Sequence, residues 1–535
     1  MKKATPILAL LLAIVMVFGL TACGKSPEKP GTDNQVSQQT SEPGNQQPDD
    51  QQPVDQGPKT LRVALSGEPT SLCELIATGA QNSPTSHLLY DTLVWRNSQD
   101  GKVYPALADS WEILDNRTAV FHLKKDAKAI DGSPITAEDV LFSLKSARDC
   151  TTTLVSAYVN YDIDACEIID EHTIKIVASH DYSQIVNLLG NRNFLIYSKS
   201  LVEAAGGFEA IAQTGAAATG PYKLVEWIPG DHITLTRNEY YHGEPGYYDN
   251  IELYFISDGA TRAMALQSGQ VDFIYGLSPA LIADIENAEG LKVIQTLSGS
   301  VLTMFFNARD NEALRDVRVR KAIAYGINKD AIVEVAYSGV ARAADSLVPA
   351  NSPYYTEMDP YYNPEEAKRL LAEAGYGDGL TLHLLALQSE SKLCEIMNNQ
   401  LAQIGINLDM TIVDVPNVVK ASQAGEYDLF IFSRFGSDPS YSIYALDGRR
   451  PSPKEENFTM LDDPSIYNLL DIVYSSTDVN AGRAAMHELD LWNAENFFTL
   501  PLIDSISLFG AKENIDGVYL DYNGMHPFYG KLFEK

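Results

Sequence analysis

The sequence predicts an α/β protein with two or more lobes. Its 535 residues exceed what one ordinary hydrophobic core holds. Hydrophobic residues make up 45% of the chain and charged residues 21%, a globular composition that can bury a large interior. From about residue 60, short strand patterns alternate with helix patterns, an order that is typical of sheets covered by helices.

The start of the chain is typical of a secretion signal, which we predict over residues 1–22. Lys2 and Lys3 precede a 14-residue apolar run, Ile7 to Leu20, that is too short to span a bilayer comfortably. The run ends in the letters LTACG at 20–24, which resemble the bacterial lipobox. That resemblance implies that Cys23 becomes the first residue and carries diacylglycerol and palmitate-like acyl chains. An ordinary signal peptide followed by a chance cysteine is the alternative.

Residues 23–58 predict a flexible linker behind the lipid anchor. They are rich in Gln, Pro, Asp, Ser and Gly, and almost none is apolar. Such a stretch cannot bury enough surface to offset the entropy of ordering. We therefore expect these residues to hold a folded body away from the membrane.

The charge balance argues against nucleic acid as a partner. The formal net charge is −31, and the first 58 residues contribute only four Lys against six acidic residues, which leaves −29 for the rest. A body this acidic repels phosphate backbones and anionic lipid headgroups. The charge of a ligand does not follow, because a pocket can differ from the net field.

Local patterns predict several elements of the folded part. Apolar residues alternate over 61–65 and predict a first strand. Thr136 and Asp139 have the spacing of a capping box and predict the start of a helix.

A βαβ unit is predicted in the second half of the chain. Asn363 is a good N-cap with Pro364 in the first turn, and Gly375 suits the C-terminal stop of that helix. A strand pattern from 380, a helix near 391–403 and an alternating strand over 406–412 follow.

Four stretches, in order along the chain, resemble one family: the extracellular solute-binding proteins of family 5, which bind peptides, dipeptides or nickel for ABC importers. These stretches are Trp111–Arg148, Thr219–Leu224 with Arg237–Tyr241, Leu266–Asp272, and Phe306–Asn307 with Asp316–Ala322. Residues such as Asp131, Gly132 and Thr136 in the first stretch suit turns and caps, so we expect them to lie far from any ligand.

The resemblance implies a two-lobed fold like that of the periplasmic binding proteins (type II, large cluster C-like). Two crossover strands join the lobes, and the first lobe carries an extra subdomain. By analogy, lobe I covers about 60–297 and 500–535, with the subdomain near 96–205, and lobe II covers 298–499. Ligand binds between the lobes, which close over it by hinge motion.

The function implied by the resemblance is that of a substrate-binding lipoprotein on the extracytoplasmic face of the bacterial cell membrane. It would capture oligopeptide-like or dipeptide-like solutes, deliver them to an ABC permease and ATPase complex, act as a monomer and need no cofactor. The same scaffold could instead bind nickel, a metallophore, heme or a sugar, because pocket chemistry sets the ligand.

The first stretch that resembles the family's ligand-lining segments contains Thr78, Gly79 and Ala80. Backbone groups in this stretch would pair with an extended peptide. The family often reads S-L-D-P just before it, where this chain reads SLCE at 71–74. An ordinary surface loop is the alternative.

The second such stretch follows a buried-looking strand over 427–431. In peptide binders an Asp four positions before the Pro pairs with the peptide's α-ammonium group, and here Phe435 occupies that position. Arg434 favours a carboxylate-bearing ligand, with a solvated rim arginine as the alternative. The candidate residues are Phe432, Ser433, Arg434, Phe435 and Asp438.

No catalytic or metal site is predicted. The chain has no H-E-x-x-H, since His487-Glu488 lacks its second His, and no G-x-S-x-G. Cys73, Cys150, Cys166 and Cys394 lack zinc spacing; they are either disulfide partners or buried thiols. Some of the 28 tyrosines are possible cleft residues, although core or surface placement is the simpler expectation for each: Tyr90, Tyr354, Tyr355, Tyr441 and Tyr444.

Overall fold

A computed structural model shows that the folded part of the chain begins at Gln56. The structure describes residues 57–77, 81–97, 101–150, 160–435, 439–450, 452–521 and 524–535. The predicted signal peptide, Cys23 and nearly all of the predicted linker lie outside these residues. The α/β class is confirmed, since strands and helices alternate along the described chain.

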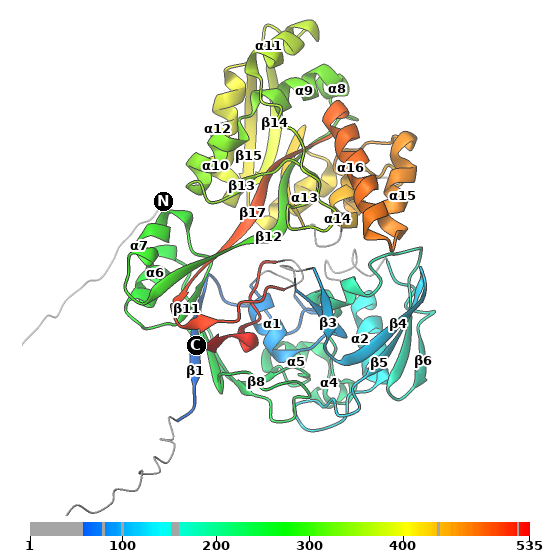
Figure 1. Cartoon of the computed structure of the whole chain (residues 1–535), viewed down its shortest axis with the longest axis vertical. Helices are drawn as coiled ribbons and strands as arrows, with labels where there is room; N and C mark the ends of the chain where they lie inside the picture. The colour runs from blue at the N-terminus through cyan, green and yellow to red at the C-terminus, as the bar shows by residue number, and fades with distance from the viewer. Residues whose placement is uncertain are drawn as a thin grey trace, which may run out of the picture. The chain divides into compact units, whose positions relative to one another are not determined.

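A long mixed sheet runs through the unit (Figure 1). Its strand order is β15-β14-β16-β12-β17-β11-β1-β10-β9-β8, and β13 pairs with β17 beside this path. The strands are β1 Thr60–Leu65, β8 Tyr222–Ile228, β9 His232–Arg237, β10 Asn250–Phe255, β11 Phe273–Tyr275, β12 Leu291–Phe306, β13 Arg342–Ala343, β14 Leu380–Leu387, β15 Ile406–Val413, β16 Leu429–Phe435 and β17 Thr499–Lys512.

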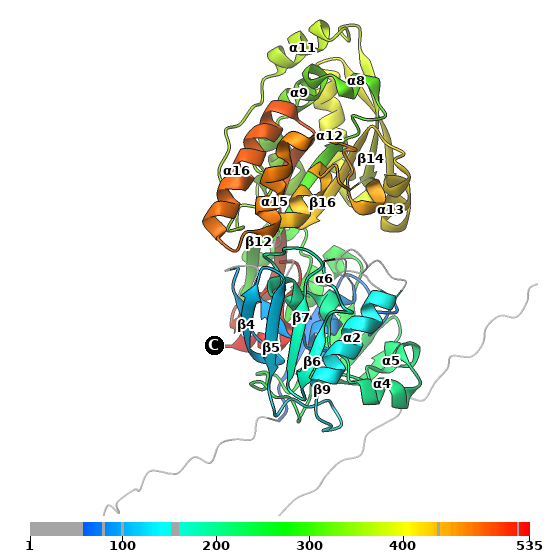
Figure 2. The same cartoon turned by 90° about the vertical axis from the view of Figure 1, so that its right-hand side faces the viewer.

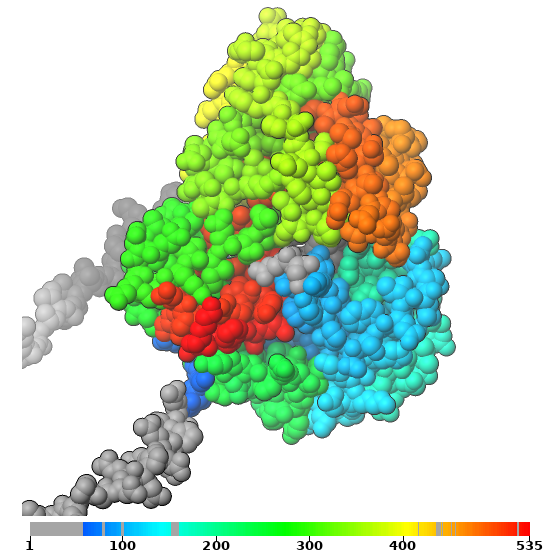
Figure 3. Space-filling model, viewed as in Figure 1, coloured from blue at the N-terminus to red at the C-terminus, as the bar shows by residue number. Residues whose placement is uncertain are grey.

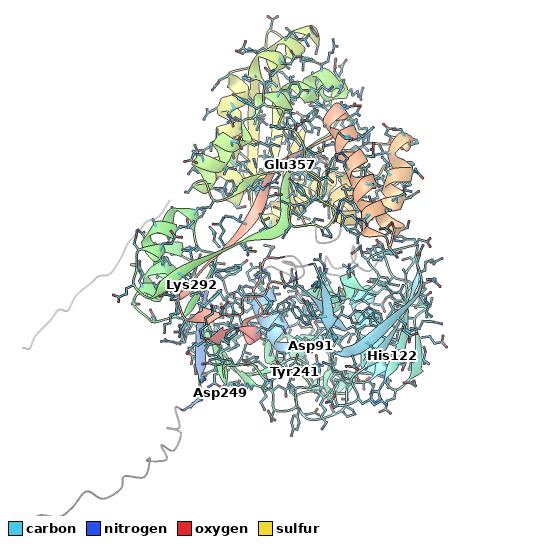
Figure 4. The ribbon with its side chains drawn as sticks, in the orientation of Figure 1. Asp91, His122, Tyr241, Asp249, Lys292 and Glu357 are labelled. Atoms are coloured by element: carbon cyan, nitrogen blue, oxygen red, sulfur yellow. The ribbon has the colours of Figure 1, made fainter. Side chains whose placement is uncertain are left out.

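Two strands of this sheet are the crossover strands that the family resemblance implied. β12 and β17 pair antiparallel from Leu291↔Lys512 to Phe305↔Thr499. In the strand order of the sheet, β11, β1 and β10 follow β17 on one side, and β16, β14 and β15 follow β12 on the other. We call the first part, with β1–β11, lobe I and the second part, with β13–β16 and α8–α16, lobe II. Lys292, near the start of β12, lies on the lobe I side (Figure 4).

The expected lobe boundaries stay a prediction. Residues 297 and 298 lie inside β12, and residues 499 and 500 open β17. β12 is irregular at the same place: its register against β17 shifts across the three residues between Leu297 and Val301. Gly299 within it has φ +67°, a conformation that favours glycine.

Lobe I carries a separate four-stranded sheet, of order β4-β5-β7-β6, and the helix predicted at Thr136 (Figure 2). The capping box is confirmed: Glu138 N donates to Thr136 Oγ1 at 3.3 Å, and Thr136 N donates to Asp139 Oδ2 at 2.8 Å. The elements are β2 Val94–Arg96, β3 Val103–Pro105, β4 Ala108–Asp115, β5 Thr118–Leu123, β6 Glu167–Asp170, β7 Thr173–Val177, β18 Ile515–Asp516, β19 Phe533–Glu534, α1 Ser83–Leu89, α2 Ala137–Asp149, α4 Lys199–Ala205, α5 Phe208–Thr214, α6 Gly259–Gln267 and α7 Ile282–Glu286.

Lobe II contains the predicted βαβ unit. β14 and β15 pair parallel with Leu380 opposite Ile406, and α12 connects them. The helix predicted after Asn363 is α11; the Asn363 side chain accepts from Glu366 N, and Gly375 has φ +90° beyond its end. The helices are α8 Glu312–Arg315, α9 Val317–Gly326, α10 Lys329–Tyr337, α11 Pro364–Glu373, α12 Ser391–Ala402, α13 Val415–Ala424, α14 Pro439–Ile443, α15 Tyr467–Ser475 and α16 Val479–Asn496.

Short 3₁₀ helices complete both lobes. They are η1 Asn187–Gly190, η2 Arg192–Phe194, η3 Pro279–Leu281, η4 Gln388–Glu390, η5 Tyr444–Leu446, η6 Pro453–Glu455, η7 Pro464–Ile466 and η8 Tyr529–Lys531.

The family-like stretches hold the fold together. Asp272 is 6% exposed and pairs with both Arg62 and Lys512, which ties β1 to the end of β17. Arg320 donates to backbone carbonyls, at 2.7 Å to Asn496 O and 2.6 Å to Leu314 O. Gly220 passes so close to the backbone of α1's end that an added Cβ would lie 2.8 Å from Leu88 O. These residues of the family-like stretches therefore stabilise the architecture of the chain.

Two further sequence questions are answered within the described residues. Cys73, Cys166 and Cys394 are buried thiols without a disulfide. None of the described helices is both long enough and apolar enough to span a bilayer.

Candidate functional site

A cavity of about 460 Å³ lies where the β4–β7 part of lobe I meets lobe II. Its size is within the usual range for sites that bind small molecules. Figure 3 shows α15 and α16 of lobe II directly above this part of lobe I. Lobe I contributes Asn160, His180 and Asp181, and lobe II contributes Tyr444, Asp447, Arg449, Arg450, Asp471, Tyr474 and Ser475.

The two lobes touch beside this cavity. Ser183 N donates to Tyr474 O at 2.9 Å, at the end of α15. Gln184 Nε2 donates to Tyr354 Oη at 3.3 Å, and both side chains are buried. Tyr474 therefore lines the cavity and also takes part in the contact between the lobes.

An arginine on the lobe II side is held by two aspartates. Arg449 makes a two-point contact with Asp447, at 2.8 Å from Nε to Oδ1 and 3.0 Å from Nη2 to Oδ2. Its Nη1 donates to Asp471 at 2.5 Å. The hydrogen bond that Arg449 donates to Asp447 is the main cause that raises the pKa of Arg449. This cation is thus already engaged within lobe II.

A second arginine lies against an aromatic ring. The Arg450 guanidinium is 3.5 Å from the centroid of the Tyr444 ring, a close cation–π contact. Tyr444 is 1% exposed, so the ring is a fixed platform, and Arg450 N donates to Asp447 O at 3.0 Å. The platform presents Arg450 as part of the cavity wall.

The cavity wall therefore combines both signs of charge. Lobe II supplies two guanidinium groups and two carboxylates, and lobe I supplies Asp181 together with the side chains of His180 and Asn160. Guanidinium groups bind carboxylates, and carboxylates bind ammonium groups. Such a wall suits a ligand that carries both.

The first predicted ligand-lining stretch, Thr78, Gly79 and Ala80, lies outside the described residues. Just before it, Glu74 is 1% exposed; its carboxylate accepts from Arg192 Nη1 at 3.0 Å and from Ser86 Oγ at 2.7 Å. Glu74, which stands where the family often has Pro, thus forms a buried ion pair with Arg192 within lobe I.

The second predicted stretch is described only in part. Asp438 and the side chain of Phe435 lie outside the described residues. Phe432 and Ser433 are half-buried on β16, and the Phe432 ring stacks 5.5 Å from that of Phe430. None of Phe432, Ser433 and Arg434 is among the described residues that line the cavity.

Arg434 occupies an internal position that the sequence did not indicate. It is 5% exposed, and its Nη2 donates to Glu456 Oε2 at 3.1 Å. Its guanidinium also lies 5.5 Å from the Phe458 ring centroid. The charge that favoured an anionic ligand is therefore paired inside lobe II.

Most of the lining residues were missed by sequence reasoning. Tyr444 was considered as a cleft residue, and it does line the cavity, while Tyr354 contacts lobe I beside it. Tyr90 is instead buried in the core of lobe I. A signal was present in the pair Arg449-Arg450, flanked by Asp447 and Tyr444, but nothing local placed it opposite residues 160–181.

Other charged clusters of the described residues support the fold. Asp91 and Tyr241 lie together in lobe I (Figure 4), and Tyr241 Oη donates to Asp91 Oδ2 at 3.2 Å. Burial raises the pKa of Asp91. Within the described ranges, no three His, Cys, Asp or Glu side chains are grouped so that they could hold a metal ion.

Comparisons with known proteins agree with this architecture. The family model of the bacterial extracellular solute-binding proteins, family 5 (Middle), matches residues 102–453. The glutathione-binding protein GsiB of Pectobacterium atrosepticum is 29% identical over 362 residues, which are 66% of this chain and 69% of that protein.

Solved structures share the fold. NikA from Brucella suis, in complex with Fe(III)-EDTA, superposes with a TM-score of 0.78 at 24% identity, over 89% of this chain and 100% of that one. DppA from Helicobacter pylori, in complex with the peptide STSA, gives 0.75 at 21% identity, over 89% and 98%. The expected two-lobed binding-protein fold is confirmed, and the chain belongs to family 5 of the bacterial extracellular solute-binding proteins.

Proposed function

We propose that this protein is the substrate-binding component of an ABC importer and that it captures short peptides or peptide-like zwitterions. The observation that carries the proposal is the cavity between the lobes, lined by guanidinium groups from lobe II and by carboxylates from both lobes. A short peptide carries both an ammonium group and a carboxylate, and such a wall offers partners for both. Two of the similar proteins, a glutathione-binding protein and a binding protein in complex with a peptide, support the same ligand class.

Binding would favour the closed arrangement of the lobes. A ligand that contacts Asp181 in lobe I and Arg450 in lobe II adds contacts that exist only when the lobes are together. It therefore shifts the equilibrium toward closure by its difference in affinity for the two states. An importer's permease and ATPase could then distinguish a loaded protein from an empty one. Binding and release need no covalent step, so we propose no enzymatic activity.

The test is ligand identification followed by titration. The full chain, purified in detergent, is analysed by native mass spectrometry before and after mild denaturation, and calorimetry then covers tripeptides, glutathione, nickel with histidine, heme and maltose. We expect peptide-like ligands with Kd values at or below micromolar. Binding of only the nickel complex, heme or the sugar would assign the scaffold to a non-peptide ligand and contradict the proposal.

We also propose that Cys23 carries the lipid anchor and that the protein acts as a monomer outside the cytoplasmic membrane. Several acyl chains on one residue hold a protein firmly, since each buried CH₂ contributes about 0.8 kcal/mol. The Cys23→Ser variant is expected to leave the membrane fraction and to lack the acyl mass on the N-terminal peptide. Equal retention of both forms in the membrane would contradict the anchor.

A further inference from the structure

Two polar groups on the lobe I side of the cavity lack partners among the residues that the structure describes. Asn160 is 1% exposed and lines the cavity, yet its Nδ2 has no hydrogen-bond acceptor within the described residues. A buried amide that stays unpaired costs about 1–3 kcal/mol, so nearly all such groups have a partner.

Backbone contacts with the chain that follows β7 hold Asn160 in place. Its carbonyl accepts from Ser179 N at 3.0 Å, and Tyr161 forms a bridge with Ala178, so residues 160–161 run beside the chain that leaves β7. The same chain reaches Asp181 two residues after Ser179. Asn160 and Asp181 therefore lie at the same edge of lobe I, and both line the cavity.

The carboxylate of Asp181 also differs from the others in the cavity wall. Asp447 and Asp471 both accept hydrogen bonds from Arg449. Asp181 is exposed, and its carboxylate makes no hydrogen bond or ion pair within the described residues. Among the described residues, the wall thus contains one carboxylate without a positively charged partner and one amide donor without an acceptor.

We propose that Asp181 binds the α-ammonium group of the ligand and that Asn160 Nδ2 donates to a carbonyl or carboxylate oxygen of the same ligand. This inference rests on the proposed function and narrows its substrate class to peptide-like molecules with a free amino group. An ammonium group needs anionic or carbonyl acceptors once it leaves water, and Asp181 supplies one. Because the aromatic platform of Tyr444 and Arg450 belongs to lobe II, a ligand held by Asp181 and Asn160 bridges the lobes.

The test uses a peptide digest as the probe. The full chain, purified in detergent, is incubated with a peptic digest of casein and with the same digest after N-acetylation, and retained peptides are quantified by mass spectrometry. We expect the wild type to retain unmodified peptides in preference to acetylated ones. Asp181→Asn should lower retention of unmodified peptides about tenfold, the low end for a hydrogen bond to a charged group.

Asp109→Asn is the matched control, because Asp109 is another exposed aspartate of the four-stranded-sheet part and is not among the residues that line the cavity. Asn160→Ala should weaken retention of both digests by a similar factor, since its contact does not involve the ammonium group. Thermal unfolding of each empty variant shows whether the protein still folds.

The outcomes separate the two levels of the proposal. If the wild type retains no peptide from either digest, the proposed function fails, and this inference fails with it. If the wild type retains peptides and Asp181→Asn retains them equally, or if acetylation has no effect, the assignment of Asp181 is wrong while the peptide function stands.

Discussion

A buried aspartate in lobe II is expected to make the protein less stable as the pH rises toward neutrality. Asp490 lies in α16 and is 4% exposed. Its Oδ2 accepts from Ser346 Oγ at 2.7 Å and its Oδ1 from Leu347 N at 2.8 Å, so it ties α16 to the chain after β13. Burial is the main cause that raises the pKa of Asp490 to about 7.

The sign and size of the effect follow from this pKa. An unfolded Asp loses its proton near pH 4, whereas folded Asp490 keeps its proton up to about pH 7. Between these values the folded state binds more protons, so the free energy of unfolding falls as the pH rises. A difference of about 3 pKa units corresponds to about 4 kcal/mol, lost progressively between pH 4 and pH 7.

The Asp490→Asn variant cannot ionise and should lack this pH dependence. Urea unfolding, followed by tryptophan fluorescence from pH 4.5 to 7.5, gives the free energy of unfolding at each pH. We expect the curve of the variant to be flatter than that of the wild type by a few kcal/mol across this range. Glu488→Gln, an exposed change on the same helix, should leave the slope unchanged. If the wild type and Asp490→Asn have the same slope, Asp490 does not titrate as its burial requires.

Two further predictions concern the contact between the lobes and the ion pair of lobe I. Tyr354→Phe removes the hydroxyl that accepts a hydrogen bond from Gln184 Nε2 across the lobes and should lower the closed-to-open ratio about two- to tenfold, as one neutral hydrogen bond does. Fluorescence energy transfer between dyes on the two lobes measures this, and an equal loss in Tyr355→Phe, whose hydroxyl bonds within lobe II, would refute a specific role. Arg192→Met leaves Glu74 buried without its partner and should destabilise the protein by about 3–5 kcal/mol in urea unfolding. Adding Glu74→Gln should restore part of that loss; a double variant as unstable as the single one would show that the buried charge is not the cause.

Local elements of this protein are readable from its sequence. Thr136 caps α2, and Asn363 caps α11, because the cap and its target N–H groups are within three residues of each other. The β14–α12–β15 unit follows from alternating apolar residues over short spans. The family-like stretches are readable for a related reason. They contain residues such as Asp272 and Arg320, whose ion pairs and hydrogen bonds lie within the fold rather than in the cavity.

The site depends on contacts that no local pattern contains. Arg434 looked available for a ligand, but Glu456, 22 residues further on, pairs with it inside lobe II. Asp181 and Arg450 lie on different lobes and meet at one cavity because β12 and β17 hold those lobes together. Sequence spacing predicts which side chains share a helix or a strand. Which charges are already paired, and which face a cavity, is decided by distances across the folded chain, and these arise only when the lobes pack.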